Sequence, residues 1–501
     1  MEGIMRFIEY GTIKKRAANR FALIYPDVYR AGNSNLGIHY VYNIVNEARD
    51  FSIERFFLDF ERSIETKDML KNFKALLFSL NYEYGIINLL KILKNNNIPI
   101  LREERKDHLV ITGGPLNVNP FVLKDVFDIA FVGDAEKSLV EFIEIYTTLD
   151  DPKRQIEEFA KIEGIYIPEI HRENKIKRRI EKLTYHPLYE PIQWGDFEES
   201  FNKTFLLEVS RGCRSRCEFC LTGNALGPYR ERSIEELIHI VKEGQKRTKF
   251  EKIALIGSDM PSSIDEIINS IGELGFQISL PSLKLKDINL GTIPFLGQDT
   301  ITLAPESSES LRYDIGKYYS DEEFFEKINL IKKYSKSVKL YFIFGLPGEE
   351  IKDLDEVIEF IKKSRKMIRT KSSFNPFVPK PHTPFEDYIF DFSKLKEKMK
   401  YITSNIKDVR IEEFIDVMMK NWRDIAAHLN SNFKRPLARI IFSEKIIYLY
   451  DKYVEKSEDI EIMNKHLAAK KTNDFYRLSP SLQSNVNSLF KLKKLNTDMS
   501  Y

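Results

Sequence analysis

The sequence predicts an α/β protein with two successive sheets, each built from strands that alternate with helices. Apolar runs rich in β-branched residues recur between segments of helical periodicity over residues 20–148, and again from residue 204 to 377. Several runs end in turn residues, such as Thr112-Gly-Gly-Pro115 and Val132-Gly-Asp-Ala135, where a doubly wound parallel sheet places its ligand-binding loops. After about residue 390 the pattern becomes helical and polar.

The first array predicts a five-stranded, flavodoxin/Rossmann-like parallel sheet domain over residues 1–150. Its expected strands are residues 21–25, 53–58, 75–79, 109–112 and 129–132. Residues 151–200 are highly charged and carry three prolines around one short apolar run, Gly164-Ile-Tyr-Ile-Pro168. This composition is typical of a linker, and we expect at most a small hairpin within it.

The second array predicts a partial (β/α)6 barrel over residues 201–385. Six βα units are too few to close an eight-stranded barrel, and a sheet that curves this way presents its chemistry at the C-terminal ends of the strands. The expected strands are residues 205–209, 253–257, 277–280, 300–303, 338–344 and 372–377. Residues 386–501 are expected to form a helical C-terminal region.

The charge balance and the apolar runs of the sequence bear on which partners and which location we expect for the protein. The 501 residues include 77 basic and 75 acidic side chains, and a net charge of +2 makes no case for a nucleic-acid or acidic-membrane partner. The N-terminus lacks the basic-then-apolar layout of a secretory signal, and no apolar run approaches the roughly 18 to 20 residues of a membrane span. We therefore expect a cytoplasmic protein.

The three cysteines of the chain all fall in one loop, as Cys213, Cys217 and Cys220 in a C-x3-C-x2-C pattern after the first strand of the second array. Three thiolates can hold three irons of a [4Fe-4S] cluster, and the fourth iron is then open to S-adenosylmethionine (SAM). A zinc site completed by a histidine and a disulfide with a spare thiol are the alternatives. Three arginines crowd the loop and are expected either to favour the anionic cluster or to be solvated: Arg211, Arg214 and Arg216.

With four later segments in order, the cysteine loop resembles the radical SAM enzymes, and within them the branch that carries a cobalamin-binding-type domain ahead of the barrel. These segments are Ile256-Gly-Ser-Asp259, Ala304-Pro-Glu-Ser-Ser-Glu-Ser-Leu-Arg312, Phe342-Ile-Phe-Gly-Leu-Pro-Gly-Glu349 and Asn375-Pro-Phe-Val-Pro-Lys-Pro-His-Thr-Pro384. The resemblance implies a [4Fe-4S] cluster on the three cysteines and SAM as cofactor. It also implies a set of SAM-binding residues: Phe219, Gly257, Ser258, Asp259, Glu306, Ser307, Arg312, Gly345 and Pro347.

The N-terminal domain matches this branch less closely. Its D-x-H-x-x-G turn reads Asp27-Val-Tyr-Arg-Ala-Gly32 here, so that Tyr29 stands in place of a cobalt-binding histidine, and a neutral phenol is a poor ligand for cobalt. The resemblance implies five cobalamin-facing positions: Tyr29, Gly32, Ser79, Gly113 and Gly114. Cobalamin is a candidate cofactor, and without it the domain is expected to be a scaffold or a substrate lid.

The resemblance implies that an external one-electron reductant, such as a ferredoxin or flavodoxin, drives cleavage of SAM to a 5′-deoxyadenosyl radical. That radical abstracts hydrogen from an unactivated carbon, which leads either to cobalamin-dependent C-methylation or to cobalamin-free coupling, ring formation or rearrangement in lipid or cofactor biosynthesis. A non-catalytic iron–sulfur electron carrier or sensor is a third reading. Methylthiotransferases share the barrel but add three cysteines that this chain lacks. The pattern assigns no catalytic side chain and no substrate.

Overall fold

The computed structural model describes residues 8–411, except 83, 119, 173–175, 189, 195–200, 282, 296–298, 378–379, 381, 386–391 and 408. Most of the predicted helical C-terminal region therefore lies outside the described residues. Its described part begins with α12 (Phe392–Asn405). Over the described ranges, no helix combines the length and the apolar character needed to cross a membrane.

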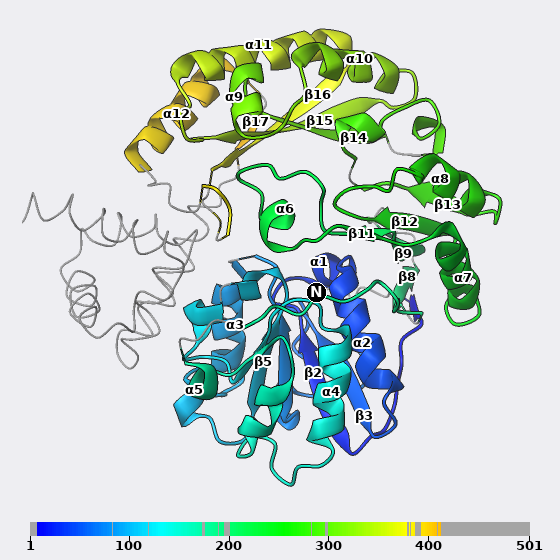
Figure 1. The fold of residues 1–501 in the computed structure, drawn as a ribbon, viewed down its shortest axis with the longest axis vertical. Helices are drawn as coiled ribbons and strands as arrows, with labels where there is room; N and C mark the ends of the chain where they lie inside the picture. Colours follow the sequence, from blue (N-terminus) through cyan, green and yellow to red (C-terminus); the bar gives the residue numbers. More distant parts are fainter. Residues whose placement is uncertain are drawn as a thin grey trace, which may run out of the picture.

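The N-terminal part is a sheet with helices on both faces (Figure 1). All five predicted strands are present and pair in parallel in the order β3-β2-β4-β5-β6. The strands are β2 (Asn19–Ile24), β3 (Phe51–Phe56), β4 (Ala75–Ser79), β5 (Leu109–Gly113) and β6 (Ile129–Phe131). The helices are α1 (Tyr29–Asn33), α2 (Leu36–Glu47), α3 (Tyr84–Asn95) and α4 (Glu136–Tyr146).

The sheet has a sixth strand that the sequence pattern did not predict. β7 (Ile165–Tyr166) pairs antiparallel with β6, and the short helix before it packs Phe159 on Phe142 with ring centroids 4.4 Å apart. The prediction of a linker was wrong for this segment, because its few apolar residues cover an open sheet edge instead of pairing with one another. Later in this segment, β8 (Ile192–Trp194) pairs antiparallel with the distant β1 (Ile8–Tyr10).

The second part is a curved array of parallel strands with helices on its outer side (Figure 1). All six predicted strands are present, but among the described residues they are hydrogen-bonded as two sheets, β13-β12-β9 and β14-β15-β16-β17. The strands are β9 (Thr204–Glu208), β12 (Lys252–Ile256), β13 (Gln277–Ser279), β14 (Thr300–Glu306), β15 (Ser337–Phe344), β16 (Arg369–Pro376) and a seventh, β17 (Val409–Ile411). The outer helices include α7 (Ile234–Gln245), α8 (Ile264–Gly272), α10 (Asp321–Ile331) and α11 (Ile351–Met367).

Local sequence explains where two outer helices begin. Ser233 and Glu236 form a reciprocal capping box at the start of α7, and Ser320 and Glu323 do the same at α10. Such a box satisfies backbone N–H groups that the first helical turn leaves without an intrahelical partner. These caps fix the point at which the chain enters each outer helix after the long segments that follow β9 and β14.

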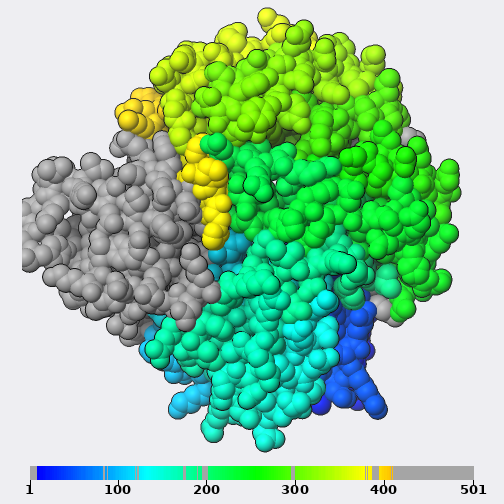
Figure 2. Space-filling model, viewed as in Figure 1, coloured from blue at the N-terminus to red at the C-terminus, as the bar shows by residue number. Residues whose placement is uncertain are grey.

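The two parts share one core and a polar boundary. A single cluster of buried apolar residues runs from Ile24 and Phe78 in the first sheet to Phe205 and Leu207 in the second. Figure 2 shows residues of the N-terminal part (blue to cyan) directly against those of the strand array (green). This contact brings the carboxyl ends of the first sheet opposite the loop that follows β9.

Glu190 is a buried carboxyl at this boundary, and it predicts a pH effect on stability. Its Oε2 accepts the backbone N–H of Leu206 at 2.8 Å, while burial raises the pKa of Glu190 well above its ordinary value. A carboxyl whose pKa is raised by folding contributes stability below its unfolded pKa and loses it as the pH rises through the folded pKa. Wild type is therefore expected to lose stability relative to Glu190→Gln as the pH rises from 5 to 8.

The slope of that loss is at most about 1.4 kcal/mol per pH unit, the limit for one proton. Urea denaturation at several pH values, followed by circular dichroism, measures it. Glu157→Gln, at an exposed position, is the control. A constant difference between wild type and Glu190→Gln across this range would contradict the prediction.

Candidate functional site

The cysteine loop begins directly after the short strand β10 (Ser210–Arg211) and ends in α6 (Leu221–Ala225). Gly212 has φ = +80°, and a Cβ there would lie 2.6 Å from the carbonyl oxygen of Pro228, so glycine is required at the entrance. At the exit, Asn224 Nδ2 donates to the carbonyl oxygens of Cys217 (2.9 Å) and Cys220 (2.8 Å). The loop is thus held in shape by the chain on both sides.

The three thiols are half-buried and close enough to act on one another. Burial raises the pKa of the Cys217 thiol; Lys317 lowers it, and Cys220, Glu306 and Cys213 raise it further. In the part of the chain that the structure describes, no three His, Cys, Asp or Glu side chains are grouped to hold a single metal ion. A [4Fe-4S] cluster makes a different demand, because each thiolate binds an iron of its own. Three thiols on one loop fit that demand.

Asp259, which follows β12, is bound to the cysteine loop through both carboxylate oxygens. Its Oδ2 accepts the backbone N–H and the Nε–H of Arg214 at 3.0 and 2.8 Å. Its Oδ1 lies 2.8 Å from Lys284 Nζ and 3.3 Å from Lys286 Nζ. Burial alone would raise the pKa of Asp259, but the hydrogen bonds from Arg214 and Lys284 outweigh it and hold the pKa well below the ordinary value. Arg214 is therefore ion-paired with Asp259, although its side chain stays 37% exposed.

The neighbours of Asp259 explain why this segment lies so close to the loop. A Cβ at Gly257 would be 2.3 Å from Ser210 Oγ, and that hydroxyl donates to the carbonyl oxygen of Asp259 at 2.7 Å. Ser258, between them, is exposed. A side chain at position 257 would separate the end of β12 from β10.

Glu306 lies at the end of β14 in a strained backbone conformation. Its φ is +67°, which non-glycine residues rarely adopt, and the pairing with β15 shifts register between Leu303 and Glu306. The shift directs its carboxylate to Lys317, whose Nζ is 2.8 Å from Oε1. The hydroxyl of the adjacent buried Ser307 has no hydrogen-bond partner among the described residues. Glu306 borders the cysteine loop, since it and Lys317 both act on Cys217.

Phe219 packs in a small apolar cluster that joins the cysteine loop to three other segments. Its neighbours there include Leu311 of α9 (Glu309–Asp314), Leu346 after β15 and Phe377 after β16. Gly345, with φ = +82°, and half-buried Pro347 flank Leu346 in the same turn. The structure thus brings Phe219 together with the segments predicted to bind SAM after β14 and β15.

The Arg312 side chain is held by groups near its own turn, and its binding of SAM stays a prediction. Its side chain is 1% exposed and donates to the carbonyl oxygens of Pro305 (2.8 Å), Ser307 (3.0 Å) and Tyr319 (2.7 Å). It also pairs with Asp321 at 2.8 Å. A guanidinium with four of its five N–H groups used in this way holds the turn after β14.

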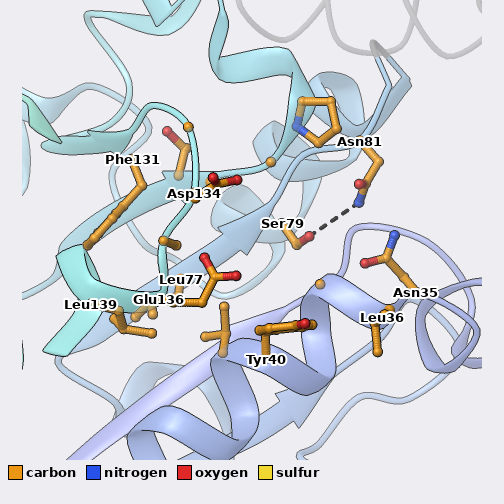
Figure 3. Close-up of a pocket in the computed structure, with 18 of the residues that line it drawn as sticks. Asn35, Leu36, Tyr40, Leu77, Ser79, Asn81, Phe131, Asp134, Glu136 and Leu139 are labelled. Carbon is orange, nitrogen blue, oxygen red and sulfur yellow. Dashed lines mark hydrogen bonds between the residues drawn. The ribbon is translucent and has the colours of Figure 1, made fainter. Parts of the chain in front are cut away.

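A cavity of about 480 Å³ lies at the carboxyl ends of the first sheet, between that sheet and the loop after β9. Figure 3 shows Leu36 and Tyr40 of α2 on one side and Leu77, Ser79 and Phe131 of the sheet on the other. Three of the five predicted cobalamin-facing residues line it, namely Ser79, Gly113 and Gly114. Most of the lining is apolar, with polar groups gathered near the strand ends.

Tyr29 and Gly32, the other two, do not line this cavity, and their contact with cobalamin stays a prediction. The Tyr29 hydroxyl donates to Glu9 at 2.5 Å, and its ring packs against Phe57. A Cβ at Gly32 would point into the Phe57 ring at 2.3 Å. The chain turns once more after α1, so the first residues of α2 line the cavity in place of the predicted turn.

The wall of the cavity nearest the cysteine loop is a network of ion pairs centred on Arg211. Its guanidinium donates to Glu208 at 2.8 and 3.0 Å, to Asp134 at 2.9 Å and to Glu136 at 2.7 Å. Tyr40 donates to Glu208 at 2.6 Å. Burial would raise the pKa of Glu208, but Arg211 and the other donors outweigh it and lower the pKa. All five residues line the cavity, and Arg211 lies two positions before Cys213.

Sequence reasoning missed several of these residues. Asp134 lies in the turn Val132-Gly-Asp-Ala135, so a signal for it was present. Lys284, Lys317 and Tyr40 carry none: each lies outside any motif, and only the fold brings it to the site.

Comparison with known proteins agrees with this geometry. The family model described as "Radical SAM proteins, N-terminal" matches residues 37–168, and the "Radical SAM superfamily" model matches residues 207–361. The uncharacterized protein MJ0966 of Methanocaldococcus jannaschii is 34% identical over 456 residues, which are 87% of this chain and 96% of that protein. A tRNA-2-methylthio-N(6)-dimethylallyladenosine synthase of Sulfurihydrogenibium sp. is 22% identical over 251 residues, 46% of this chain and 56% of that protein.

Among solved structures, the radical S-adenosylmethionine methyltransferase TsrM from Kitasatospora setae, with cobalamin and a [4Fe-4S] cluster bound, is similar in fold. The match has a TM-score of 0.51 at 14% identity and covers 74% of this chain and 77% of that chain. The superfamily model spans the cysteine loop and the ends of β12, β14 and β15, where the structure gathers its site. The chain therefore belongs to the radical SAM superfamily.

Proposed function

We propose that the protein is a cobalamin-dependent radical SAM enzyme that methylates an unactivated carbon of its substrate. The observation that supports this best is the cavity at the carboxyl ends of the first sheet, which opens next to the cysteine loop. An open α/β sheet binds its ligand at this edge. A ligand held there would face the cluster site across Arg211.

In this proposal Cys213, Cys217 and Cys220 hold the [4Fe-4S] cluster, and SAM binds beside them against Phe219 and the turns after β12, β14 and β15. When bound, the cluster supplies one electron to SAM, and cobalamin carries a methyl group. The electron comes from an external donor of the ferredoxin or flavodoxin class. The apolar cluster around Phe219 would keep water from the radical.

The residues of the cavity suit a flat ring system with polar edges. Its depth is apolar, formed by Leu77, Ile111, Phe131 and Leu139. Gly113 leaves its rim open, since a Cβ at this position would meet no atom within 4 Å. A ligand ring can therefore approach the backbone closely at the end of β5.

The cavity supplies no strong ligand for cobalt. The described residues that line it include no His, Cys or Met. We infer that cobalamin would be held by its edges and its nucleotide, with no side chain coordinated to the metal.

Substitution of Gly113 tests the location of this cofactor. Gly113→Leu is expected to raise the Kd for hydroxocobalamin roughly ten- to hundredfold, because a side chain that overfills a site costs about 1 to 3 kcal/mol. The backbone itself is not strained by the change, since Gly113 has an ordinary φ. Anaerobic titration followed by the cobalamin absorbance spectrum measures the Kd.

Gly113→Ala is the matched control and should bind within about twofold to threefold of wild type, because its one methyl group enters open space. Equal binding by wild type and Gly113→Leu would place cobalamin elsewhere. A wild-type protein that takes up an iron–sulfur cluster and cleaves SAM but binds no cobalamin would remove the methylation proposal and leave the cobalamin-free reactions.

A further inference from the structure

Lys284 contacts the cysteine loop although it belongs to a different βα unit of the strand array. It lies in the turn after β13, and its Nζ is 3.2 Å from Cys213 Sγ, 2.9 Å from Ser215 Oγ and 2.8 Å from Asp259 Oδ1. Two of the three N–H donors of the ammonium group are hydrogen-bonded to the sulfur and the hydroxyl, and the carboxylate of Asp259 pairs with its charge. The side chain is 19% exposed, so its charge is only partly screened by water.

Asp259 fixes the direction of that ammonium group. Its carboxylate is 0% exposed and bridges Lys284 on one oxygen to Arg214 on the other. Arg214 follows Cys213 in the chain, and its backbone N–H also donates to Asp259. The carboxylate therefore ties the turn after β13 to the residue beside the first cysteine. Lys284 cannot move away from Cys213 without breaking this bridge.

We propose that Lys284 is a positioning residue for the iron–sulfur cluster, which donates a hydrogen bond to the sulfur of Cys213 and makes the cluster easier to reduce. Hydrogen bonds to the ligating sulfurs and nearby charge both set the reduction potential of such clusters. Reduction by one electron adds negative charge to the cluster, and a fixed cation next to a ligating sulfur stabilises the reduced form more than the oxidised form. The proposal rests on the cluster assigned above to the three cysteines.

The neighbouring Lys286 provides a matched control. It also pairs with Asp259, at 3.3 Å to the same oxygen as Lys284, but its side chain is 45% exposed. Both lysines thus place one charge beside one carboxylate. Of these two lysines, only Lys284 has a hydrogen bond to a cysteine sulfur in the described part of the chain.

The experiment is a redox titration of the anaerobically reconstituted protein without SAM, followed by the EPR signal of the reduced cluster. At the potential where wild type is half-reduced, the ratio of reduced to oxidised cluster should fall about tenfold in Lys284→Met. For a one-electron couple this is a shift of about 59 mV to lower potential. Lys286→Met should stay within about twofold of wild type, and Lys284→Arg should recover most of the loss.

Iron content is measured first for each variant. If Lys284→Met does not take up a full cluster, the comparison passes to Lys284→Gln, which keeps an N–H donor but removes the positive charge and should shift the potential in the same direction. Equal potentials in wild type and the variant tested would overturn the inference. Equal shifts in the Lys284 and Lys286 variants would also overturn it, because charge alone would then explain them. A wild-type protein that binds no cluster would overturn the proposed function instead.

Discussion

Cys217→Ala is expected to lower the conversion of SAM to 5′-deoxyadenosine by about a thousandfold or more, because groups that act as one unit lose most of their effect when one is removed. The chain has no further cysteine to replace the lost thiolate. Two thiolates on a loop whose shape is fixed by Gly212 and Asn224 cannot move to hold a third iron. The product is measured by chromatography after anaerobic reduction with dithionite, together with iron per chain.

Glu218→Gln tests whether the loss is specific to the thiolate. Glu218 lies in the same loop, and its backbone N–H donates to Ile315 at 3.0 Å whatever its side chain. This variant should keep its iron and most of its SAM cleavage. Substantial 5′-deoxyadenosine from Cys217→Ala, with iron retained, would show that the three-cysteine site does not carry the chemistry.

Arg211→Met is expected to lower the free energy of unfolding by about 3 kcal/mol. Removing one partner of a buried ion pair leaves the other charge unpaired, which costs about 3 to 5 kcal/mol. We expect the lower end because the Arg211 side chain is 21% exposed. The variant would remove the ion pair of Glu136, while Asp134 would keep Arg230 and Glu208 would keep Arg232. Urea denaturation followed by circular dichroism measures the loss.

Arg154→Met is the matched surface control. Its guanidinium is 86% exposed and pairs with Asp151 at 3.3 Å. A pair of this kind is worth about 0 to 1 kcal/mol. If both variants lose the same small amount of stability, the Arg211 network does not hold the two parts together. Arg211→Met should also weaken hydroxocobalamin binding, since all of these groups line the cavity.

Hydrophobic periodicity predicted the strands well because it reports a property that the strands share. Most strands of both arrays are buried on at least one face and carry an apolar run that can be recognised without its neighbours; β16 (Arg369–Pro376), with few apolar residues, is an exception. β7 was missed for the opposite reason. Its two residues, Ile165 and Tyr166, form too short a run to be read alone, and they become a strand only because β6 offers an open edge.

The residues of the candidate site also divide into those that the sequence predicted and those that it did not. Cys213, Cys217 and Cys220 were predictable because their chemistry lies in the spacing of adjacent residues. Arg312 shows the limit of a motif: the residue is in the right place in the sequence, but its side chain turns back onto the carbonyl groups of its own loop. Lys284 shows the reverse, since a lysine 71 residues from Cys213 has no local signal and meets it only after two βα units have folded.

At position 306, the stability of the fold and the chemistry of the site favour different residues. A left-handed conformation at a residue with a Cβ costs on the order of 1 kcal/mol, and glycine would remove that cost. Glycine would also remove the carboxylate that pairs with Lys317 beside the cysteine loop. Selection for stability alone would favour glycine at this position. A glutamate retained here in homologous proteins would therefore indicate selection for the function of its side chain.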